Sequence, residues 1–196
     1  MLNKGKLIIF SAPSGSGKTT LINKLRQDNP ELAFSISATT RKPRRNEKNG
    51  VEYFFMSRKN FKEKIDNNHF VEYKTVYGNL YGTLRTYVEK MINKGKSVIF
   101  DIDVQGALAI KEQYPDDVVM IFIYPPSLEV LGERLKLRGT DSDEEINKRL
   151  KFAKIEMEKM KVYAYNICND SLKDSYSDIR DILAKEGIIK LKQEEK

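Results

Sequence analysis

A glycine-rich segment in the first 20 residues carries the residue types that bind phosphate. It reads Ala12, Pro13, Ser14, Gly15, Ser16, Gly17, Lys18, Thr19 and Thr20. Glycines let successive backbone N–H groups turn toward an anion, and a helix that begins there adds positive potential. A lysine can then neutralise the β- and γ-phosphates of a nucleotide, and the threonine after it can bind Mg²⁺. We expect Lys18 and Thr19 to fill these two roles.

One position departs from the usual phosphate-loop pattern, because Ala12 stands where the first glycine is expected. Alanine is nearly as small, so the change matters only if the backbone there needs a positive φ. A glycine-rich turn that binds nothing is the alternative interpretation. The segment directly follows the apolar run of residues 7–10 and directly precedes a helical pattern, and this context favours the phosphate site.

Two carboxylates, Asp101 and Asp103, follow a second apolar run. Side chains two residues apart on a strand point to the same face, and ligands of open α/β sheets gather at the carboxyl ends of the strands. We expect Asp103 to help hold Mg²⁺ and Asp101 to contact a substrate. Two solvated acids at a strand end are the alternative.

Five arginines form the third candidate group. They are Arg41, Arg44, Arg134, Arg138 and Arg149. Phosphoryl transfer requires cations around the transferred group, and arginine offers a planar, permanently charged fork for that purpose. A surface role suits any one of them alone, whereas the set as a whole indicates binding of phosphorylated ligands.

The elements that must position these residues follow an α/β pattern. Four short apolar runs, at residues 7–10, 97–100, 118–124 and 165–168, alternate with segments of helical periodicity. Continuous rather than alternating hydrophobicity is typical of strands buried on both faces. The sequence therefore predicts an α/β fold of three layers, with a central parallel sheet between helices. Cys168, in the last run, is expected in the core.

Two stretches interrupt this pattern within what we expect to be a single domain over residues 1–196. Residues 35–83 contain strand-like pieces and a hairpin turn expected at Gly78-Asn79, which predicts a small β-rich insertion. Residues 137–161 form a very polar helical segment, which predicts a mobile lid. The core then consists of residues 1–34, 84–136 and 162–196.

The composition is that of an ordinary water-soluble protein, with 40% hydrophobic and 32% charged residues. A single cysteine excludes an intrachain disulfide, and the first apolar run is too short for a signal peptide or a membrane span. We therefore expect a cytoplasmic protein without a membrane partner. The net charge of +7 fits a nucleic acid or a phosphorylated small molecule as partner and does not choose between them.

Six ordered blocks of the sequence resemble the signature of guanylate kinases. They are residues 37–44, 49–55, 70–73, 78–83, 101–106 and 138–140. The resemblance runs from Lys6 to about Asp170. It implies a P-loop NTPase fold and an enzyme that transfers the γ-phosphoryl group of ATP directly, in line, to GMP, giving ADP and GDP. It also implies Mg²⁺, dGMP as a further acceptor and a place in purine nucleotide metabolism.

The resemblance also implies residue roles. The phosphate of GMP is expected to contact Arg41, Arg44, Tyr53 and Tyr81, and its guanine to contact Ser37, Glu72, Thr83 and Asp101. ATP is expected to contact residues 12–20, Arg134 and Asn169, and the transferred phosphoryl group to contact Lys18, Arg41, Arg138 and Arg149. The chemistry is consistent, because the N1–H and N2–H₂ donors of guanine suit carboxylate acceptors. Adenine lacks these donors and would leave Glu72 unpaired, at a cost of about 1–3 kcal/mol.

Two alternatives come from other functional classes. A non-catalytic guanylate-kinase-like binding module is the first, but such modules characteristically have a degraded phosphate loop, whereas Lys18, Thr19 and the loop glycines are present here. A basic nucleic-acid binder is the second. Its best segment, residues 41–45, is interrupted by Pro43 and matches phosphate-binding positions, so we expect no nucleic-acid partner. A monomer and a homodimer both fit the sequence.

Overall fold

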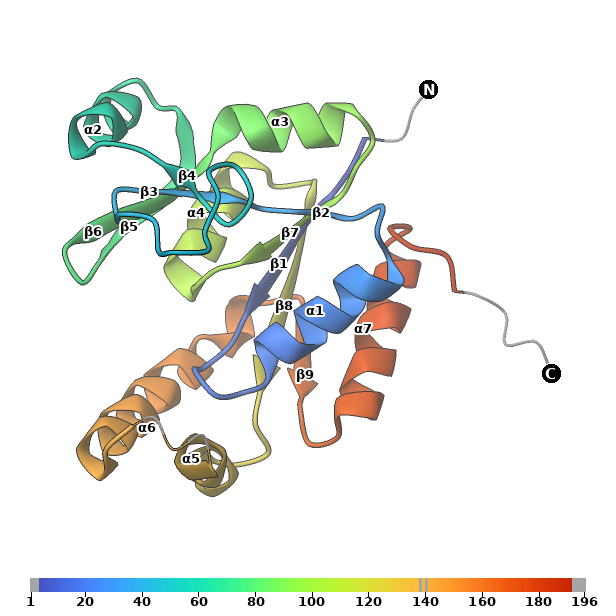
Figure 1. Cartoon of the computed structure of the whole chain (residues 1–196). Helices are drawn as coiled ribbons and strands as arrows, with labels where there is room; N and C mark the ends of the chain where they lie inside the picture. Colours follow the sequence, from blue (N-terminus) through green and yellow to red (C-terminus); the bar gives the residue numbers. More distant parts are fainter. Residues whose placement is uncertain (1–3, 138, 140, 192–196) are drawn as a thin grey trace. The chain divides into compact units, whose positions relative to one another are not determined.

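The computed structural model describes residues 4–137, 139 and 141–191, and the chain divides into two compact units (Figure 1). The first unit falls within Met1–Leu7, Glu31–Phe100 and Gln105–Val118. The second falls within Ile8–Pro30, Asp101–Val104 and Val119–Lys196. Because each unit is assembled from segments far apart in the sequence, residues that are distant along the chain can meet within one unit.

A five-stranded sheet contains the apolar runs of the sequence. Its strands, in spatial order, are β2 (Ala33–Phe34), β7 (Val98–Asp101), β1 (Leu7–Ser11), β8 (Val118–Tyr124) and β9 (Tyr165–Cys168). β2 pairs with β7 in parallel, and β8 pairs with β9 in parallel. All five residues of β1 are buried, as expected of a strand covered on both faces. The predicted α/β fold with a central parallel sheet is confirmed.

The first unit also holds a four-stranded sheet, in the order β4-β3-β6-β5. Its strands are β3 (Ser37–Thr39), β4 (Phe54–Phe55), β5 (Phe70–Val76) and β6 (Asn79–Leu84). The helices of this unit are α2 (Arg58–Asp66), α3 (Arg85–Asn93) and α4 (Val104–Gln113). Phe61 of α2 stacks on Phe70 of β5 with ring centroids 4.3 Å apart, and both belong to a buried apolar cluster under this sheet. The small sheet therefore has a core of its own.

The hairpin between β5 and β6 turns one residue earlier than predicted. Val76 pairs with Asn79, so the two turn residues are Tyr77 and Gly78 rather than Gly78 and Asn79. Both have positive φ, 47° and 78°. A two-residue turn of this kind needs positive φ at both positions and favours glycine at the second, which is where the register places Gly78. The prediction of a turn was right, and its register was wrong.

The second unit consists of strands and four longer helices. The helices are α1 (Lys18–Asp28), α5 (Leu128–Leu137), α6 (Asp143–Glu158) and α7 (Leu172–Lys185), with a short 3₁₀ turn at Met160–Val162. Figure 1 shows α1 beside α7 and α5 beside α6. Leu131 and Leu135 of α5 pack against Ile146 and Ala153 of α6. A capping box at Ser142 begins α6, which fixes where the polar helical segment starts.

Two further features of the structure differ from what the sequence predicted. Helix α4 was not predicted, although Val104, Ala107 and Ile110 are buried at helical spacing. Cys168 is exposed, so the expectation that it lies in the core was wrong. It is the last residue of β9, where the strand leaves the core. Within the described parts of the chain, no helix combines the length and hydropathy that crossing a bilayer requires.

Candidate functional site

The glycine-rich loop connects β1 to α1 and has the backbone of an anion cradle. Gly15 and Gly17 have positive φ, 102° and 86°, and Gly17 is the N-cap of α1. A positive φ next to a helix N-terminus turns backbone N–H groups toward one point. Among the described residues other than glycine, only Asn68 and Tyr77 have positive φ. Ala12 therefore replaces the first glycine of the pattern without backbone strain.

A buried asparagine supports this loop by a hydrogen bond to its backbone. Asn169, at 5% exposure, donates from Nδ2 to the carbonyl of Ser16 at 2.7 Å and from its backbone N–H to the carbonyl of Tyr124 at 2.7 Å. A Cβ atom at Gly17 would lie 2.2 Å from Asn169 Nδ2. The close approach explains why this position is glycine, and it makes Asn169 a support of the loop as well as a candidate contact to ATP.

The loop lysine forms an ion pair with the first strand-end carboxylate. Lys18, the first residue of α1, places Nζ 2.5 Å from Oδ1 of Asp101 at the end of β7. The side chains are 18% and 30% exposed, so the pair borders solvent. Asp101 was expected to contact guanine. In the structure its carboxylate is engaged with Lys18, in a different compact unit from the other expected guanine contacts.

An arginine of α6 reaches the same loop. Arg149 of α6 donates from Nη1 to Oγ of Ser14 at 3.0 Å and from Nη2 to Oδ1 of Asp141 at 3.0 Å. Asp141 lies just before α6, and its side chain is 9% exposed. Because Asp141 takes one side of the guanidinium, the other side is directed at the loop. Arg138, also expected at this site, lies outside the described residues.

A cavity of about 340 Å³ opens beside the loop within the second unit. Its lining consists of Gly15, Gly17, Thr20, Arg134, Leu137, Asn169, Asp170 and Leu172. Arg134 donates from Nη2 to the carbonyl of Asp170 at 3.5 Å. Apolar, amide and cationic groups around one space are the usual lining of a nucleotide-base site. The cavity brings together Arg134 and Asn169 with the loop, and their contact with ATP stays a prediction.

The expected magnesium ligands belong to the second unit too. Thr19, exposed at the start of α1, offers a hydroxyl, and Asp103, two residues after β7, offers a carboxylate. No cluster of three or more His, Cys, Asp or Glu side chains suited to a metal occurs in the part of the chain that the structure describes. This donor set fits Mg²⁺, which usually takes one or two protein oxygens and completes its shell with water and phosphate.

The first unit gathers three of the expected guanine contacts on its small sheet. Ser37 of β3 and Glu72 of β5 both pair with Thr83 of β6. Glu72 is 8% exposed and Thr83 is fully buried, and Thr83 Oγ1 donates to Glu72 Oε1 at 2.7 Å. Ser35 Oγ lies 3.3 Å from Thr83 Oγ1. Since Thr83 has one hydroxyl proton, Ser35 is the donor in that contact.

The same unit gathers the expected phosphate contacts. The guanidinium of Arg41 lies 5.3 Å from the ring centroid of Tyr53, and Tyr53 meets Tyr81 edge to face at 6.0 Å. Arg41 Nη2 donates to Oε1 of Glu47 at 2.7 Å. This hydrogen bond raises the pKa of Arg41, and the same bond lowers the pKa of Glu47. Arg44 is exposed, and its backbone N–H donates to Glu47 Oε2 at 2.7 Å.

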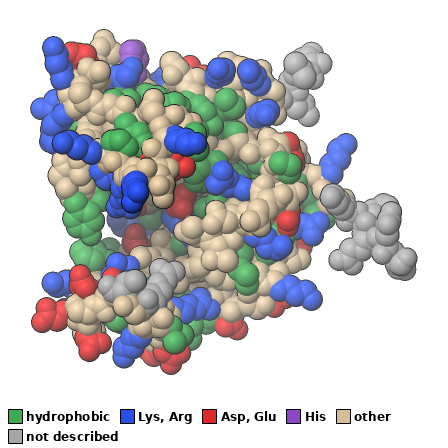
Figure 2. All heavy atoms as spheres, viewed as in Figure 1, with side chains coloured by type: hydrophobic (Ala, Val, Ile, Leu, Met, Phe, Trp, Pro, Cys, Tyr) green, Lys and Arg blue, Asp and Glu red, His purple; other side chains and the backbone are tan. Residues whose placement is uncertain are grey.

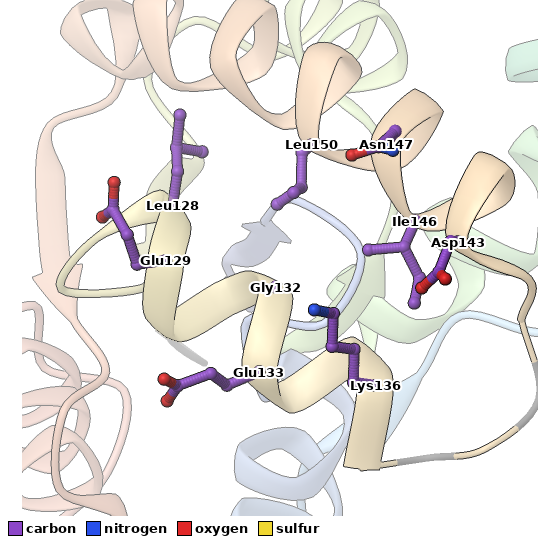
Figure 3. A pocket seen from close by; sticks show the side chains of 9 residues that line it. All are labelled: Leu128, Glu129, Gly132, Glu133, Lys136, Asp143, Ile146, Asn147 and Leu150. Carbon is purple, nitrogen blue, oxygen red and sulfur yellow. The ribbon is translucent and has the colours of Figure 1, made fainter.

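A second cavity, of about 460 Å³, lies between α5 and α6 and contains no residue of the phosphate loop (Figure 3). Leu150 and Ile146 extend from α6 toward α5, and Lys136 extends from α5 toward α6. Its lining also includes the carboxylates Glu129, Glu133 and Asp143. With three carboxylates and a single cation, Lys136, the lining does not suit a phosphorylated ligand.

Basic side chains are spread widely on the face of the molecule that Figure 2 shows. Lys and Arg groups are separated there by Asp, Glu and apolar side chains. A polynucleotide site normally gathers its cations along one stripe or patch. Two of the arginines singled out by the sequence have contacts elsewhere: Arg149 contacts the phosphate loop, and Arg41 lies over rings at the small sheet.

Three polar residues at these sites were not predicted from the sequence. Ser35 contacts Thr83, one of the expected guanine contacts, Glu47 holds Arg41, and Asp141 holds Arg149. Ser35 is itself buried and follows the strand β2, and a polar residue in such a position is a usable signal of a ligand or hydrogen-bond network. The two acids carried no such signal, because charged residues in polar loops are usually solvated.

Comparison with known proteins gives a consistent result. The guanylate kinase family model matches residues 4–186. The guanylate kinase of Bacteroides thetaiotaomicron is 49% identical over 180 residues, covering 91% of this chain and 88% of that protein. That of Myxococcus xanthus is 44% identical over 187 residues, covering 95% of this chain and 89% of that protein.

A solved structure agrees with the sequence comparisons. The crystal structure of guanylate kinase from Anaplasma phagocytophilum matches with a TM-score of 0.72 and 33% identity, covering 95% of this chain and 88% of that one. The chain therefore belongs to the guanylate kinase family of P-loop nucleoside monophosphate kinases.

Proposed function

We propose that the protein catalyses ATP + GMP → ADP + GDP. The observation that carries this proposal is the small sheet of the first unit. A buried carboxylate, Glu72, and the hydroxyl of Thr83 lie there in the same unit as Arg41, whose guanidinium lies over the rings of Tyr53 and Phe55. Carboxylate and hydroxyl acceptors suit a guanine edge, and arginine and phenol donors suit a phosphate dianion.

Selection of guanine over adenine follows from the burial of Glu72. Guanine presents N1–H and N2–H₂ as donors to the carboxylate, whereas adenine presents an unprotonated N1 at the same edge. A buried carboxylate that faces a second acceptor loses hydration without gaining a hydrogen bond, at a cost of about 1–3 kcal/mol or more. Sites built to hydrogen-bond a substrate reject analogues that lack the matching group more strongly than apolar pockets do.

The GMP phosphate is proposed to lie against Arg41, Tyr53, Tyr81 and Arg44. Arg41 is permanently charged, and its planar fork matches the spacing of two phosphate oxygens. The rings of Tyr53 and Phe55, 5.3 and 5.8 Å from the guanidinium, restrict its orientation. The acceptor phosphate would therefore be oriented before the donor nucleotide is engaged.

ATP is proposed to bind to the second unit, with its base in the cavity beside Arg134 and Asn169. Its phosphates would lie on the loop of residues 12–20, in reach of the N–H groups at the start of α1. Lys18 would then exchange its ion pair with Asp101 for the phosphates. Thr19 and Asp103 would hold Mg²⁺, which would supply positive charge to neutralise the phosphates.

The transfer itself is a direct displacement. An oxygen of the GMP phosphate forms a bond to the γ-phosphorus of ATP while the bond from that phosphorus to the β-γ bridging oxygen breaks, and ADP leaves. The positive charges of Lys18, Arg41 and Arg149 stabilise the negative charge of the transferred group, and Arg138 is proposed for the same role. No covalent intermediate with the protein is needed.

We propose that the chain has three functional parts. Residues 35–83 form the GMP-binding subdomain, residues 137–161 form the lid over ATP, and the remainder is the core. Closure of the lid would expel water from the phosphates and so limit hydrolysis of ATP. A non-catalytic binding module is not favoured, because the loop retains Lys18, Thr19 and an unstrained glycine-rich backbone.

A coupled assay of ADP formation tests this function. GMP, dGMP, AMP, CMP and UMP are each supplied with ATP and Mg²⁺, and a reaction without acceptor gives the rate of ATP hydrolysis. We expect turnover with GMP, lower or equal turnover with dGMP, and little with the other acceptors. Turnover of AMP or UMP with none of GMP would reject the proposal.

A further inference from the structure

One loop carboxylate, Glu47, contacts both arginines that are expected to bind the acceptor phosphate. Oε1 accepts from Arg41 Nη2 at 2.7 Å, and Oε2 accepts from the backbone N–H of Arg44 at 2.7 Å. The N–H of Glu47 in turn donates to the carbonyl of Arg44 at 3.1 Å. Three hydrogen bonds therefore join residue 47 to the two arginines across a loop that has no regular secondary structure.

The environment makes this contact more defined than an ordinary surface ion pair. The side chains of Arg41 and Glu47 are only 18% and 16% exposed. Arg41 Nη1 also donates to the carbonyl of Lys42 at 2.8 Å, and its guanidinium lies over the rings of Tyr53 and Phe55. The guanidinium is thus fixed by a carboxylate, a carbonyl and two rings, and its rotamer freedom is already lost before any ligand binds.

Two roles for Glu47 are chemically distinct. As a competitor, it would occupy the place of the phosphate and would have to leave when GMP binds. As a positioning residue, it would hold Arg41 by one N–H and leave the others for the ligand. A guanidinium has five N–H donors, and Glu47 and Lys42 together engage two of them. The remaining donors can still engage a phosphate, which favours the positioning role.

We propose that Glu47 is a positioning residue for acceptor-phosphate recognition, acting through the side chain of Arg41 and the backbone of Arg44. The inference deepens the function proposed above and rests on it, since it assumes that these arginines bind the GMP phosphate. It predicts that Glu47 affects ligands that carry the phosphate and leaves the nucleoside part of recognition unchanged. A residue with a merely structural role in the loop would affect both.

The test uses two substitutions at this position and a matched control in the same loop. Glu47→Ala removes both acceptors. Glu47→Gln keeps an acceptor for Arg41 but places an amide donor near the N–H of Arg44. Glu52→Gln is the control, because Glu52 also accepts a backbone N–H, that of Lys48 at 2.6 Å, without contacting an arginine in any described hydrogen bond. Urea unfolding of each variant checks that the fold is retained.

We expect KM for GMP to rise about tenfold or more in Glu47→Ala and by less in Glu47→Gln, with KM for ATP within about twofold of wild type. The inhibition constant of guanosine, which lacks the phosphate, should not change. A lower KM for GMP would identify Glu47 as a competitor and overturn the inference. Equal losses for GMP and guanosine, or values matching Glu52→Gln, would overturn it as well. If the wild-type protein does not phosphorylate GMP, the proposed function itself fails, and the two failures remain distinct.

Discussion

Replacement of Gly17 by alanine perturbs the phosphate loop at its tightest point. The residue has φ 86° and caps α1, and an added Cβ would lie 2.2 Å from Asn169 Nδ2. Two separate costs follow. Alanine must adopt a left-handed backbone, and the Asn169 amide must move away from the carbonyl of Ser16, to which it donates at 2.7 Å.

The magnitudes of the two costs can be worked separately. A left-handed conformation costs an L-residue about 1–2 kcal/mol. Loss of the Asn169 hydrogen bond costs about 0.5–1.5 kcal/mol, because the carbonyl of Ser16 is left without that donor in a buried setting. We expect Gly17→Ala to lower the free energy of unfolding by about 2–3 kcal/mol. Displacement of the loop should also raise KM for ATP by about tenfold or more.

The assay is urea unfolding at constant pH, combined with initial rates at varied ATP. Gly187→Ala is the matched control, because Gly187 has φ 70° and a Cβ there would meet nothing within 4 Å. It should lose only the backbone part, about 1–2 kcal/mol, with KM for ATP unchanged. In the double variant with Asn169→Ala, the collision is absent. The loss of unfolding free energy in the double variant should therefore be smaller than the sum of the losses in the two single variants.

Equal destabilisation by Gly17→Ala and Gly187→Ala, with the same KM for ATP, would refute this reasoning. It would mean that the contact between Gly17 and Asn169 contributes nothing beyond backbone conformation. Simple additivity with Asn169→Ala would lead to the same conclusion. A loop tolerant of a side chain at that position is not the anion cradle described above.

Three further predictions concern other contacts of the second unit. Lys18→Ala should remove most activity while the urea midpoint stays near that of wild type, because the lysine serves the transferred phosphoryl group more than the core; undiminished activity would contradict this. Asp141→Asn should lower kcat about tenfold, since the charged hydrogen bond that directs Arg149 is weakened, and an unchanged kcat would exclude the positioning role. Burial and the hydrogen bond to Asp28 raise the pKa of Tyr176 above its usual value. The phenol then ionises first in the unfolded chain, so stability should fall as pH rises above about 10, and Tyr176→Phe should lose less stability over that range; equal slopes would argue against it.

Much of the fold followed from the sequence because burial on both faces leaves a local signature. The runs at residues 7–10 and 118–124 are apolar throughout, and both are strands of the central sheet. Helix α4 was missed although Val104, Ala107 and Ile110 are buried at helical spacing, because Gly106 in its first turn is a poor helix former. Cys168 was placed in the core because its neighbours are apolar, but the strand end is exposed. The local hydrophobic pattern thus predicted where the strands lie, but it did not predict the burial of the last residue of β9.

For the candidate site, the sequence indicated which residue types could bind phosphate but not which residues they contact. The loop and the arginines carry chemistry that is visible one residue at a time. Their partners depend on tertiary structure: Arg149 meets Ser14 across 135 positions, and Lys18 meets Asp101 at another strand end. Glu47 lies six residues after Arg41 in an irregular loop, where no periodicity indicates which charges meet. The sequence shows which charged and polar groups the chain contains, and the structure shows which of them contact each other.

Titration calorimetry of wild type and Glu72→Gln with GMP and with AMP tests the central claim most directly, because the claim is that a buried carboxylate selects guanine. Glu63→Gln, an exposed glutamate on α2, serves as the control. Wild type and the control should bind GMP at least about tenfold more tightly than AMP, a difference of about 1.4 kcal/mol. In Glu72→Gln this preference should largely disappear through weaker GMP binding. Equal affinity of wild type for the two nucleotides, or an undiminished preference in Glu72→Gln, would contradict the account.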